Sequence, residues 1–166
     1  MKNNIKLSIF IASLFLAFGC SEDYLETAPS EFISADDLQD AAVNNPEVVG
    51  GILSGIYTTM VETGTGGTDL DHDDFGQKGY DLYSDFLSSD MVLGATNYGW
   101  YRRLTEYVPT QDFTSNDNYK PWRYYYRIIR SSNEVIEALG GNDIVPELAE
   151  NRWILGQAKT LRAHAY

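Results

Sequence analysis

The residues with the clearest potential to bind a ligand lie at Asn97–Tyr101, which reads N-Y-G-W-Y. The stretch lacks the spacing of a helix, and Gly99 allows the backbone to turn. Sugar rings present flat C–H faces that aromatic rings can cover, while amide groups bond the hydroxyls. We therefore predict that Trp100, Tyr98, Asn97 and Tyr101 form one edge of a glycan-binding site.

Two alternatives concern the same stretch. Arg102 and Arg103 follow it directly, and they could bond sugar hydroxyls or an acidic sugar. Trp100 could instead be buried between helices, because large aromatic side chains are well buried on average. The sequence leaves both alternatives open.

Aspartates gather at Asp69–Asp74, where a cation could bind. An EF-hand loop needs Gly at its sixth position and Glu at its twelfth. Counted from Asp69, these positions hold Asp74 and Tyr80, which excludes an EF-hand. We expect a solvated loop that caps the next helix and predict no metal site, with a looser cation site as the alternative.

No motif of a known catalytic centre is present. The sequence has neither G-x-S-x-G nor H-E-x-x-H, and its two histidines, His72 and His164, are far apart. Carboxylates are numerous enough for a glycosidase pair, but none stands in a recognisable context. We predict a binding protein without enzymatic activity or cofactor, and keep a glycan hydrolase subunit as a weaker alternative.

The chain is strongly acidic, with 24 Asp and Glu against 12 Lys and Arg and a formal net charge of −12. A surface of this sign repels the phosphates of DNA and RNA, so we exclude a nucleic-acid partner. The length of 166 residues fits about one domain.

Residues 1–19 are predicted to be a lipoprotein signal peptide. Lys2 and Lys6 supply a positive start, and Leu7–Phe18 is an almost uninterrupted apolar run. A run of about a dozen residues suits a secretory segment and is too short to span a membrane. Gly19 before Cys20 is the arrangement that lipoprotein signal peptidase requires, because cleavage leaves the cysteine as the new N-terminus.

Cys20 is the only cysteine, so no disulfide can form within the chain. We predict that it is lipidated, which anchors the chain to a membrane and removes a reactive thiol. Ordinary secretion with an unmodified cysteine is the alternative. With the lipid in place, residues 20–45 are expected to be a lipidated tether and strap, because Thr27, Pro29 and Ser34 discourage regular structure. A strap laid on the surface is favoured over a disordered linker by the apolar residues Tyr24, Leu25, Phe32 and Ile33.

From residue 46 to 166 the pattern predicts an all-α domain. Helices 121–139 and 146–166 are expected to lie antiparallel, because Gly140 and Gly141 provide a stop between them. Pro121 and Pro146 suit the first helical positions. Earlier helices are predicted at 46–62 and 79–92 from apolar residues at helical spacing. Residues 93–110 read as an irregular aromatic stretch, and 111–120 as a polar linker.

Spacings of three and four define the helix faces that we expect to be buried. In the helix 121–139 this face contains Trp122, Tyr126, Ile129, Ile136 and, as a buried amide, Asn133, and it is widened by Tyr125, Ile128, Val135 and Leu139. In the last helix it contains Ile154, Ala158, Leu161 and Ala165. Close packing of a neighbouring helix is expected at the small residues Gly50, Gly51, Gly55, Gly156, Ala158 and Ala163. Two such helices cannot cover their apolar faces alone, so the pair requires further helices.

These two helices resemble the first tetratricopeptide-like pair of the SusD/RagB family. The resemblance is carried by W-R-Y-Y-Y-R-I-I-R-S-S-N in one helix and G-Q-A-K-T-L-R-A-H-A-Y in the next. The matching residues are Trp122, Tyr126, Ile129, Asn133, Ala158, Leu161, Arg162, Ala163 and Tyr166. L-S-G-I-Y in the helix 46–62 and Y-L-E-T-A-P-S-E-F-I-S after the cysteine resemble two further parts of the family.

The resemblance implies a tetratricopeptide-like fold with long irregular loops and a role in nutrient uptake. Members of the family are surface lipoproteins that capture glycans and other nutrients for a SusC-like, TonB-dependent outer-membrane transporter. It also implies a ligand site with aromatic residues and an outer-membrane location facing the cell exterior. The acidic pair Glu22-Asp23 directly after the cysteine resembles the signal that exports lipoproteins of this family to that face.

Family members are several-fold longer, so residues 46–166 are expected to be an incomplete, N-terminal part of the fold. The alternative from a different class is a helical-repeat scaffold lipoprotein that binds other proteins only.

Overall fold

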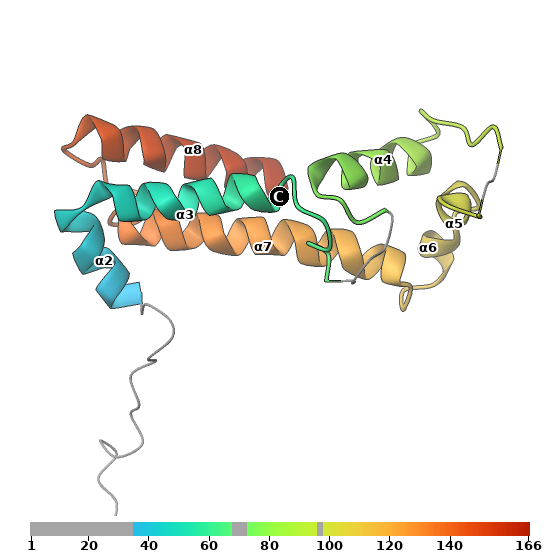
Figure 1. Ribbon diagram of the computed structural model, residues 1–166, viewed down its shortest axis with the longest axis horizontal. Coiled ribbons are helices and arrows are strands. Elements are labelled where there is room, and N and C mark those ends of the chain that lie inside the picture. The colour runs from blue at the N-terminus through green and yellow to red at the C-terminus, as the bar shows by residue number, and fades with distance from the viewer. Residues whose placement is uncertain (1–34, 68–72, 96–97) are drawn as a thin grey trace, which may run out of the picture. The chain divides into compact units, whose positions relative to one another are not determined.

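All regular structure in the described part of the chain is helical, which confirms the all-α prediction. The computed structural model describes residues 35–67, 73–95 and 98–166 (Figure 1). Its helices are α2 (Ala35–Asn44), α3 (Pro46–Thr59), α4 (Gln77–Leu87), α5 (Arg102–Thr105), α6 (Val108–Gln111), α7 (Asn116–Ala138) and α8 (Ala149–Ala165). None of these helices is long and apolar enough to cross a membrane. The predicted signal peptide, Cys20 and most of the predicted tether lie outside the described residues.

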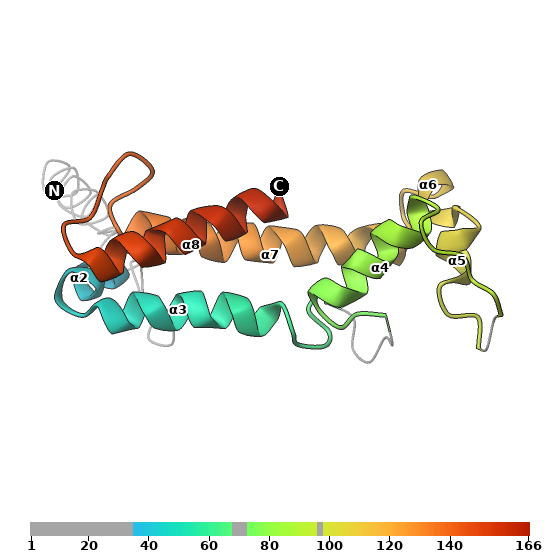
Figure 2. The same cartoon turned by 90° about the horizontal axis from the view of Figure 1, so that it is seen from above.

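Helices α3, α7 and α8 lie side by side and supply much of the core of residues 35–166 (Figures 1 and 2). As predicted, α7 and α8 run antiparallel. The chain turns between them at Gly140 and Gly141, whose φ values of 100° and 101° favour glycine. α3 packs on both helices, so an earlier helix helps to cover their apolar faces, as the sequence analysis required.

The buried face of α8 is the one predicted from the sequence. Ile154, Ala158 and Leu161 are buried, and Ala165 at the end of the helix is partly buried against the core. This face repeats every three to four residues, which is the period of a helix with one side against a core.

The glycines of α3 and α8 mark a helix contact at Gly50 alone among those predicted, where a Cβ would lie 3.8 Å from Cδ1 of Ile154 on α8. A Cβ at Gly51, Gly55 or Gly156 would meet no atom within 4 Å, so the predicted close packing at these positions is wrong. The reason in α3 is that a different face is turned to the core. The buried residues of that face are Val49, Leu53 and Ile56.

The buried face of α7 is rotated from the one predicted. Trp122 is 64% exposed and Tyr126 is 46% exposed, although both were expected in the buried stripe. The residues that are buried as expected are Ile128, Ile129, Val135, Ile136 and Leu139. Tyr125 is partly buried against the core, and Tyr124 and Ser132 are buried although neither was expected in this face. Consecutive tyrosines at 124–126 hide this rotation in the sequence, because any of the three could belong to the core.

Asn133 is exposed, so the prediction of a buried amide is wrong. Its Oδ1 accepts a hydrogen bond from Nη1 of Arg162 on α8 at 2.9 Å. Nη2 of the same guanidinium donates to Oδ1 of Asn142 at 2.7 Å. Asn133 therefore ties α7 to α8 and to the turn between them, at the surface.

Two helix starts differ from the predictions. α7 begins five residues before Pro121, because the side chain of Ser115 caps it by accepting the N–H of Asp117 at 3.3 Å. Pro121 then lies inside the helix, where its missing N–H leaves out one helical hydrogen bond. α8 begins at Ala149 rather than at Pro146.

A helix that was not predicted, α2, occupies the end of the segment expected to be tether and strap. Leu38 and Ala42 lie one turn apart, and both contact the core. Asn45 follows and caps α3 by accepting the N–H of Glu47 at 3.1 Å, and Pro46 begins α3 as predicted. The folded body therefore includes residues that precede the expected boundary at 46.

α4 lies beside the first half of α7 and contacts it through tyrosines (Figures 1 and 2). Tyr80 and Tyr83 are buried, and the ring of Tyr80 stacks on Tyr124 of α7 with their centroids 4.6 Å apart. α4 is shorter than the helix predicted at 79–92. The short helices α5 and α6 follow, in a region expected to be irregular.

Candidate functional site

A pocket of about 220 Å³ opens between the loop before α4, the loop before α5 and the first turns of α7. Its lining combines an aromatic wall with four charged side chains. The lining residues are Asp73, Gly99, Trp100, Tyr101, Arg103, Leu104, Asp117 and Lys120. Segments that are far apart in the sequence thus meet at one site.

Trp100 forms the aromatic wall and is 48% exposed, so it is not buried between helices. Tyr98 is 92% exposed, and its ring centroid lies 6.0 Å from that of Trp100. Tyr101 faces the core instead, where its ring stacks on Phe86 of α4 at 5.1 Å. Tyr101 therefore attaches the loop to the core, while Trp100 presents ring surface at the pocket.

The backbone that carries Trp100 adopts an uncommon conformation. Tyr98, Gly99 and Tyr101 have φ values of 62°, 77° and 58°. Such values are uncommon outside glycine, and residues in these regions cluster at binding sites. Leu104, which is buried, anchors α5 directly after this turn. The orientation of Trp100 is therefore set by a defined turn.

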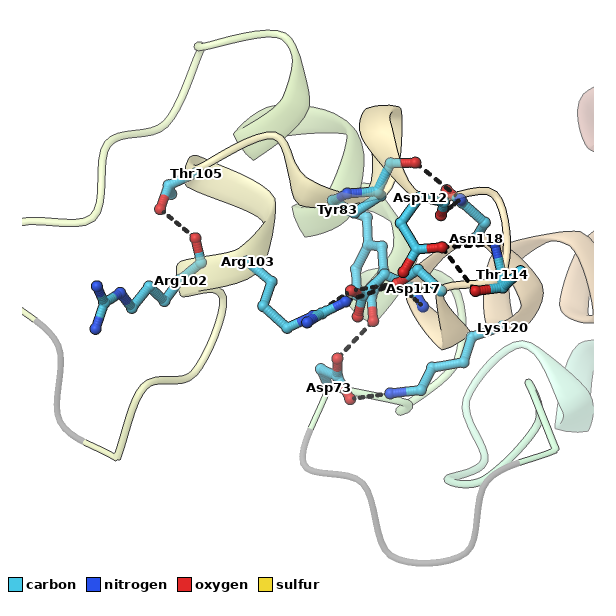
Figure 3. Close-up of polar contacts among 12 residues, drawn as sticks. Asp73, Tyr83, Arg102, Arg103, Thr105, Asp112, Thr114, Asp117, Asn118 and Lys120 are labelled. Atoms are coloured by element: carbon cyan, nitrogen blue, oxygen red, sulfur yellow. Dashed lines mark hydrogen bonds and ion pairs between the residues drawn. The ribbon is translucent and has the colours of Figure 1, made fainter.

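On the α7 side of the pocket, Lys120 is paired with Asp73 (Figure 3). Nζ lies 3.0 Å from Oδ1 of Asp73, and the hydroxyl of Tyr83 donates to Oδ2 at 2.5 Å. Lys120 is buried, and a buried lysine is normally found with a partner of opposite charge. Asp73 is thereby held between α4 and α7.

Arg103 reaches from α5 to the start of α7 (Figure 3). Its Nε donates to Oδ2 of Asp117 at 2.8 Å, and its Nη2 donates to Oγ of Ser115 at 3.0 Å. The hydrogen bond with Asp117 raises the pKa of Arg103, so the guanidinium keeps its charge. The neighbouring Arg102 points away and pairs with Glu106 at 2.7 Å.

Behind the pocket, the side chain of Asp74 is fully buried. Its oxygens accept the backbone N–H of Gly66 at 3.0 and 2.9 Å, the hydroxyl of Tyr80 at 2.7 Å and that of Thr65 at 3.4 Å. A Cβ at Gly66 would collide with the hydroxyl of Tyr80, so the loop closes on Asp74 only with glycine there. The expectation of a solvated loop is wrong for Asp74.

Of the other aspartates in the segment 69–74, Asp73 is the one that the structure describes. Asp69, Asp71 and His72 lie outside the described residues, and Asp73 is paired with Lys120. Within 35–67, 73–95 and 98–166, no group of three or more His, Cys, Asp or Glu is placed to hold a metal ion.

Three tyrosine hydroxyls around the pocket stay protonated at physiological pH. Burial raises the pKa of Tyr80 and Tyr83, and the hydrogen bonds to Asp74 and Asp73 raise it further. Burial also raises the pKa of Tyr101. These hydroxyls can therefore act as donors to the carboxylates that surround them.

Of the four residues predicted to bind a ligand, Trp100 and Tyr101 line the pocket. Tyr98 lies beside Trp100 but does not line it, and Asn97 lies outside the described residues. Of the two arginines considered in the sequence, Arg103 lines the pocket, whereas Arg102 does not.

Three charged residues of the pocket were missed by the sequence analysis. Asp73 was assigned to the acidic loop, and Asp117 and Lys120 to a polar linker. The one available signal was Ser115 followed by Asp117, which is typical of a helix start. Nothing in the sequence distinguishes Lys120 from a surface lysine.

A curated relative, the SusD-like protein P25 of Formosa agariphila, is 26% identical to this chain over 164 residues. The match covers 98% of the chain, so it includes α3, α4 and the pocket as well as the α7–α8 pair. The chain is therefore similar to a SusD-like protein over nearly its whole length. This agrees with the resemblance to the SusD/RagB family that α7 and α8 carry in their sequence.

The chain spans 29% of the length of that relative. No family model matches the chain, and no solved structure matches it. The relative and the motifs of α7 and α8 together carry the assignment.

Proposed function

We propose that this SusD-like chain binds a glycan at the cell surface and delivers it to a SusC-like, TonB-dependent outer-membrane transporter. The observation that supports glycan binding is Trp100, half-exposed on a pocket whose other walls are charged. An aromatic ring can cover the C–H face of a sugar, and charged side chains can bond its hydroxyls. The proposed role is capture of the glycan without a chemical step.

The N-terminal segment supports attachment to the outer membrane. Residues 1–19 have the pattern of a lipoprotein signal peptide, and lipid on Cys20 would anchor the chain. The likeness to a SusD-like protein supports exposure on the cell exterior and a transporter partner. On this proposal residues 20–34 tether the folded body to the membrane surface.

The test of glycan binding is Trp100→Ala in the full chain. Binding is measured by calorimetry on the strongest ligand from an array of oligosaccharides. Stacking on an aromatic ring contributes about 1–3 kcal/mol, by analogy with base–aromatic contacts. The affinity should therefore fall about 5- to 150-fold, while the melting temperature barely changes because Trp100 is half-exposed.

Trp153→Ala is the matched control, because Trp153 is an exposed tryptophan on α8 and does not line the pocket. It should leave the affinity unchanged. The proposal is contradicted if no oligosaccharide binds, or if Trp100→Ala and Trp153→Ala behave alike. A large loss of stability in Trp100→Ala would instead assign the ring to the core.

The second candidate function is a scaffold that binds other proteins, and the exposed aromatic residues of α7 favour it. Trp122 and Tyr126 stack with ring centroids 4.4 Å apart, and with Tyr166 they line a groove of about 400 Å³. Exposed aromatic patches are typical of protein interfaces. A scaffold would bind no oligosaccharide, and Trp122→Ala, but not Trp100→Ala, would weaken its association with the transporter.

A further inference from the structure

We infer that the pocket beside Trp100 takes an uncharged sugar and excludes acidic ones, and that Asp117 is the residue that sets this selectivity. The inference rests on the proposed glycan binding and goes further by naming the ligand class. It follows from the pairing of the charged side chains that line the pocket.

Both cations of the pocket are already paired with a carboxylate. Lys120 lies 3.0 Å from Asp73, and Arg103 lies 2.8 Å from Asp117. All four residues line the pocket, so the part of its lining that the structure describes holds two positive and two negative charges. The whole chain carries a net charge of −12, which adds no attraction for an anion.

An acidic sugar would meet unfavourable contacts in this arrangement. A uronate or sulfate group is acceptor-only, so it needs a donor, and the charged donors are Arg103 and Lys120. An acidic group that binds the remaining N–H donors of Arg103 would lie close to the carboxylate of Asp117, whose side chain is only 14% exposed. Asp117 would stay beside the new anion, and like charges at short range repel each other.

A neutral sugar meets no such conflict. Its hydroxyls are both donors and acceptors, so they can donate to the oxygens of Asp73 or Asp117. They can also accept from the guanidinium of Arg103 without breaking its ion pair, because a guanidinium carries five N–H donors. The C–H face of the ring can lie on Trp100.

Asp117 decides the selectivity because it neutralises the exposed cation. The side chain of Arg103 is 56% exposed, whereas that of Lys120 is 6% exposed. Asp117→Asn removes the charge that holds Arg103 and leaves a planar guanidinium, which matches a carboxylate or sulfate in shape. This variant should therefore accept acidic sugars.

The experiment compares matched neutral and acidic oligosaccharides on the full chain. The matched probes are a mannose hexamer and a mannuronate hexamer, which differ in the oxidation state of C6. An array of further neutral and acidic oligosaccharides is measured with them. The wild-type chain should bind neutral probes in preference to their acidic counterparts. In Asp117→Asn the ratio of acidic to neutral affinity should rise about tenfold, the effect of one charge-assisted hydrogen bond, and added salt should reduce this gain.

Glu106→Gln is the matched control for the change of net charge. It removes one carboxylate and releases Arg102, the neighbour of Arg103 on α5, but neither Arg102 nor Glu106 lines the pocket. Acidic binding should therefore not rise in Glu106→Gln. An equal gain in both variants would refute the role of Asp117.

The outcomes separate this inference from the proposed function. If the wild-type chain binds acidic probes more tightly than neutral ones, and Trp100→Ala abolishes that binding, the glycan site stands and the inference is overturned. If no probe binds, the proposed function fails and the inference fails with it. The wild-type comparison tests the ligand class even if Asp117→Asn does not fold.

Discussion

Removing the hydroxyl of Tyr80 tests whether the buried side chain of Asp74 stabilises the fold. That hydroxyl donates to Oδ1 of Asp74 at 2.7 Å, and both side chains are buried. The ring of Tyr80 stacks on Tyr124, a contact that Tyr80→Phe retains. The substitution therefore removes one buried hydrogen bond and little else.

The expected loss follows from the burial of the acceptor. A hydrogen bond to a charged group contributes about 1.5–3 kcal/mol, and a buried acceptor that loses its donor cannot replace it with water. Asp74 keeps the donors of Gly66 and Thr65, so we expect a loss of about 2 kcal/mol in the free energy of unfolding. For a chain of this size that lowers the melting temperature by about 4–8 °C.

The assay is thermal unfolding at neutral pH, followed by far-ultraviolet circular dichroism, with urea unfolding as a second measurement. Tyr57→Phe is the matched control, because its hydroxyl also donates a hydrogen bond, to Oε1 of Gln157 at 2.8 Å. Tyr57 is 44% exposed, so water can replace the lost bond. The control should change stability by no more than about 0.5 kcal/mol.

The reasoning is refuted if Tyr80→Phe melts with the wild-type chain, or if Tyr57→Phe loses as much stability. The first result would mean that the Asp74 network contributes nothing net to stability. The second would mean that burial does not decide the contribution of these hydroxyls.

Three further predictions follow from the fold and the sequence. Burial raises the pKa of Tyr80, Tyr83 and Tyr124 in the folded chain. Unfolded tyrosines ionise near a pH of about 10, so the free energy of unfolding should keep its full value below that pH. Above it, the free energy of unfolding should fall by about 1.4 kcal/mol per pH unit for each tyrosine. Urea midpoints across that range check it, and a flat profile contradicts it. Gly156→Ala, at an exposed position with open space, should stabilise α8 by about 0.5–1 kcal/mol. Ala158→Leu, in the core, should destabilise the fold by about 1–3 kcal/mol. Urea unfolding checks the pair, and the two changes in the free energy of unfolding should have opposite signs. Cys20→Ala should release the chain from membranes on fractionation, and full retention would argue against the lipid anchor.

The helices α3 and α8 could be predicted because their signals are local. Asn45 and Pro46 are capping residues in the correct order, and Ile154, Ala158 and Leu161 repeat at the helical period. α7 was predicted in place and type, but its start was wrong, and its buried face was correct for the isoleucines and wrong for Trp122 and Tyr126. Its start depends on the cap at Ser115, which overrides the signal of Pro121.

The rotation of α7 could not be read from the sequence. Tyr124 and Tyr126 are chemically alike, and both lie next to apolar residues. Tyr124 is buried because the ring of Tyr80 stacks on it, and Tyr126 is half-exposed. Hydrophobic periodicity predicts that a helix has a buried face. It does not locate the centre of that face within three consecutive tyrosines such as those at 124–126.

The amino-acid pattern alone was enough to predict a helical chain that resembles the SusD/RagB family, and to single out Trp100. These conclusions depend on residue types and spacings within single helices or one loop, which the chain carries in any conformation. The pocket is different, because it depends on pairings such as that of Lys120 with Asp73, residues 47 positions apart. Such a pair forms only when α4 and α7 pack together and exclude water around a buried lysine, and this packing also brings Asp73, Arg103 and Asp117 to the ring that the sequence had indicated.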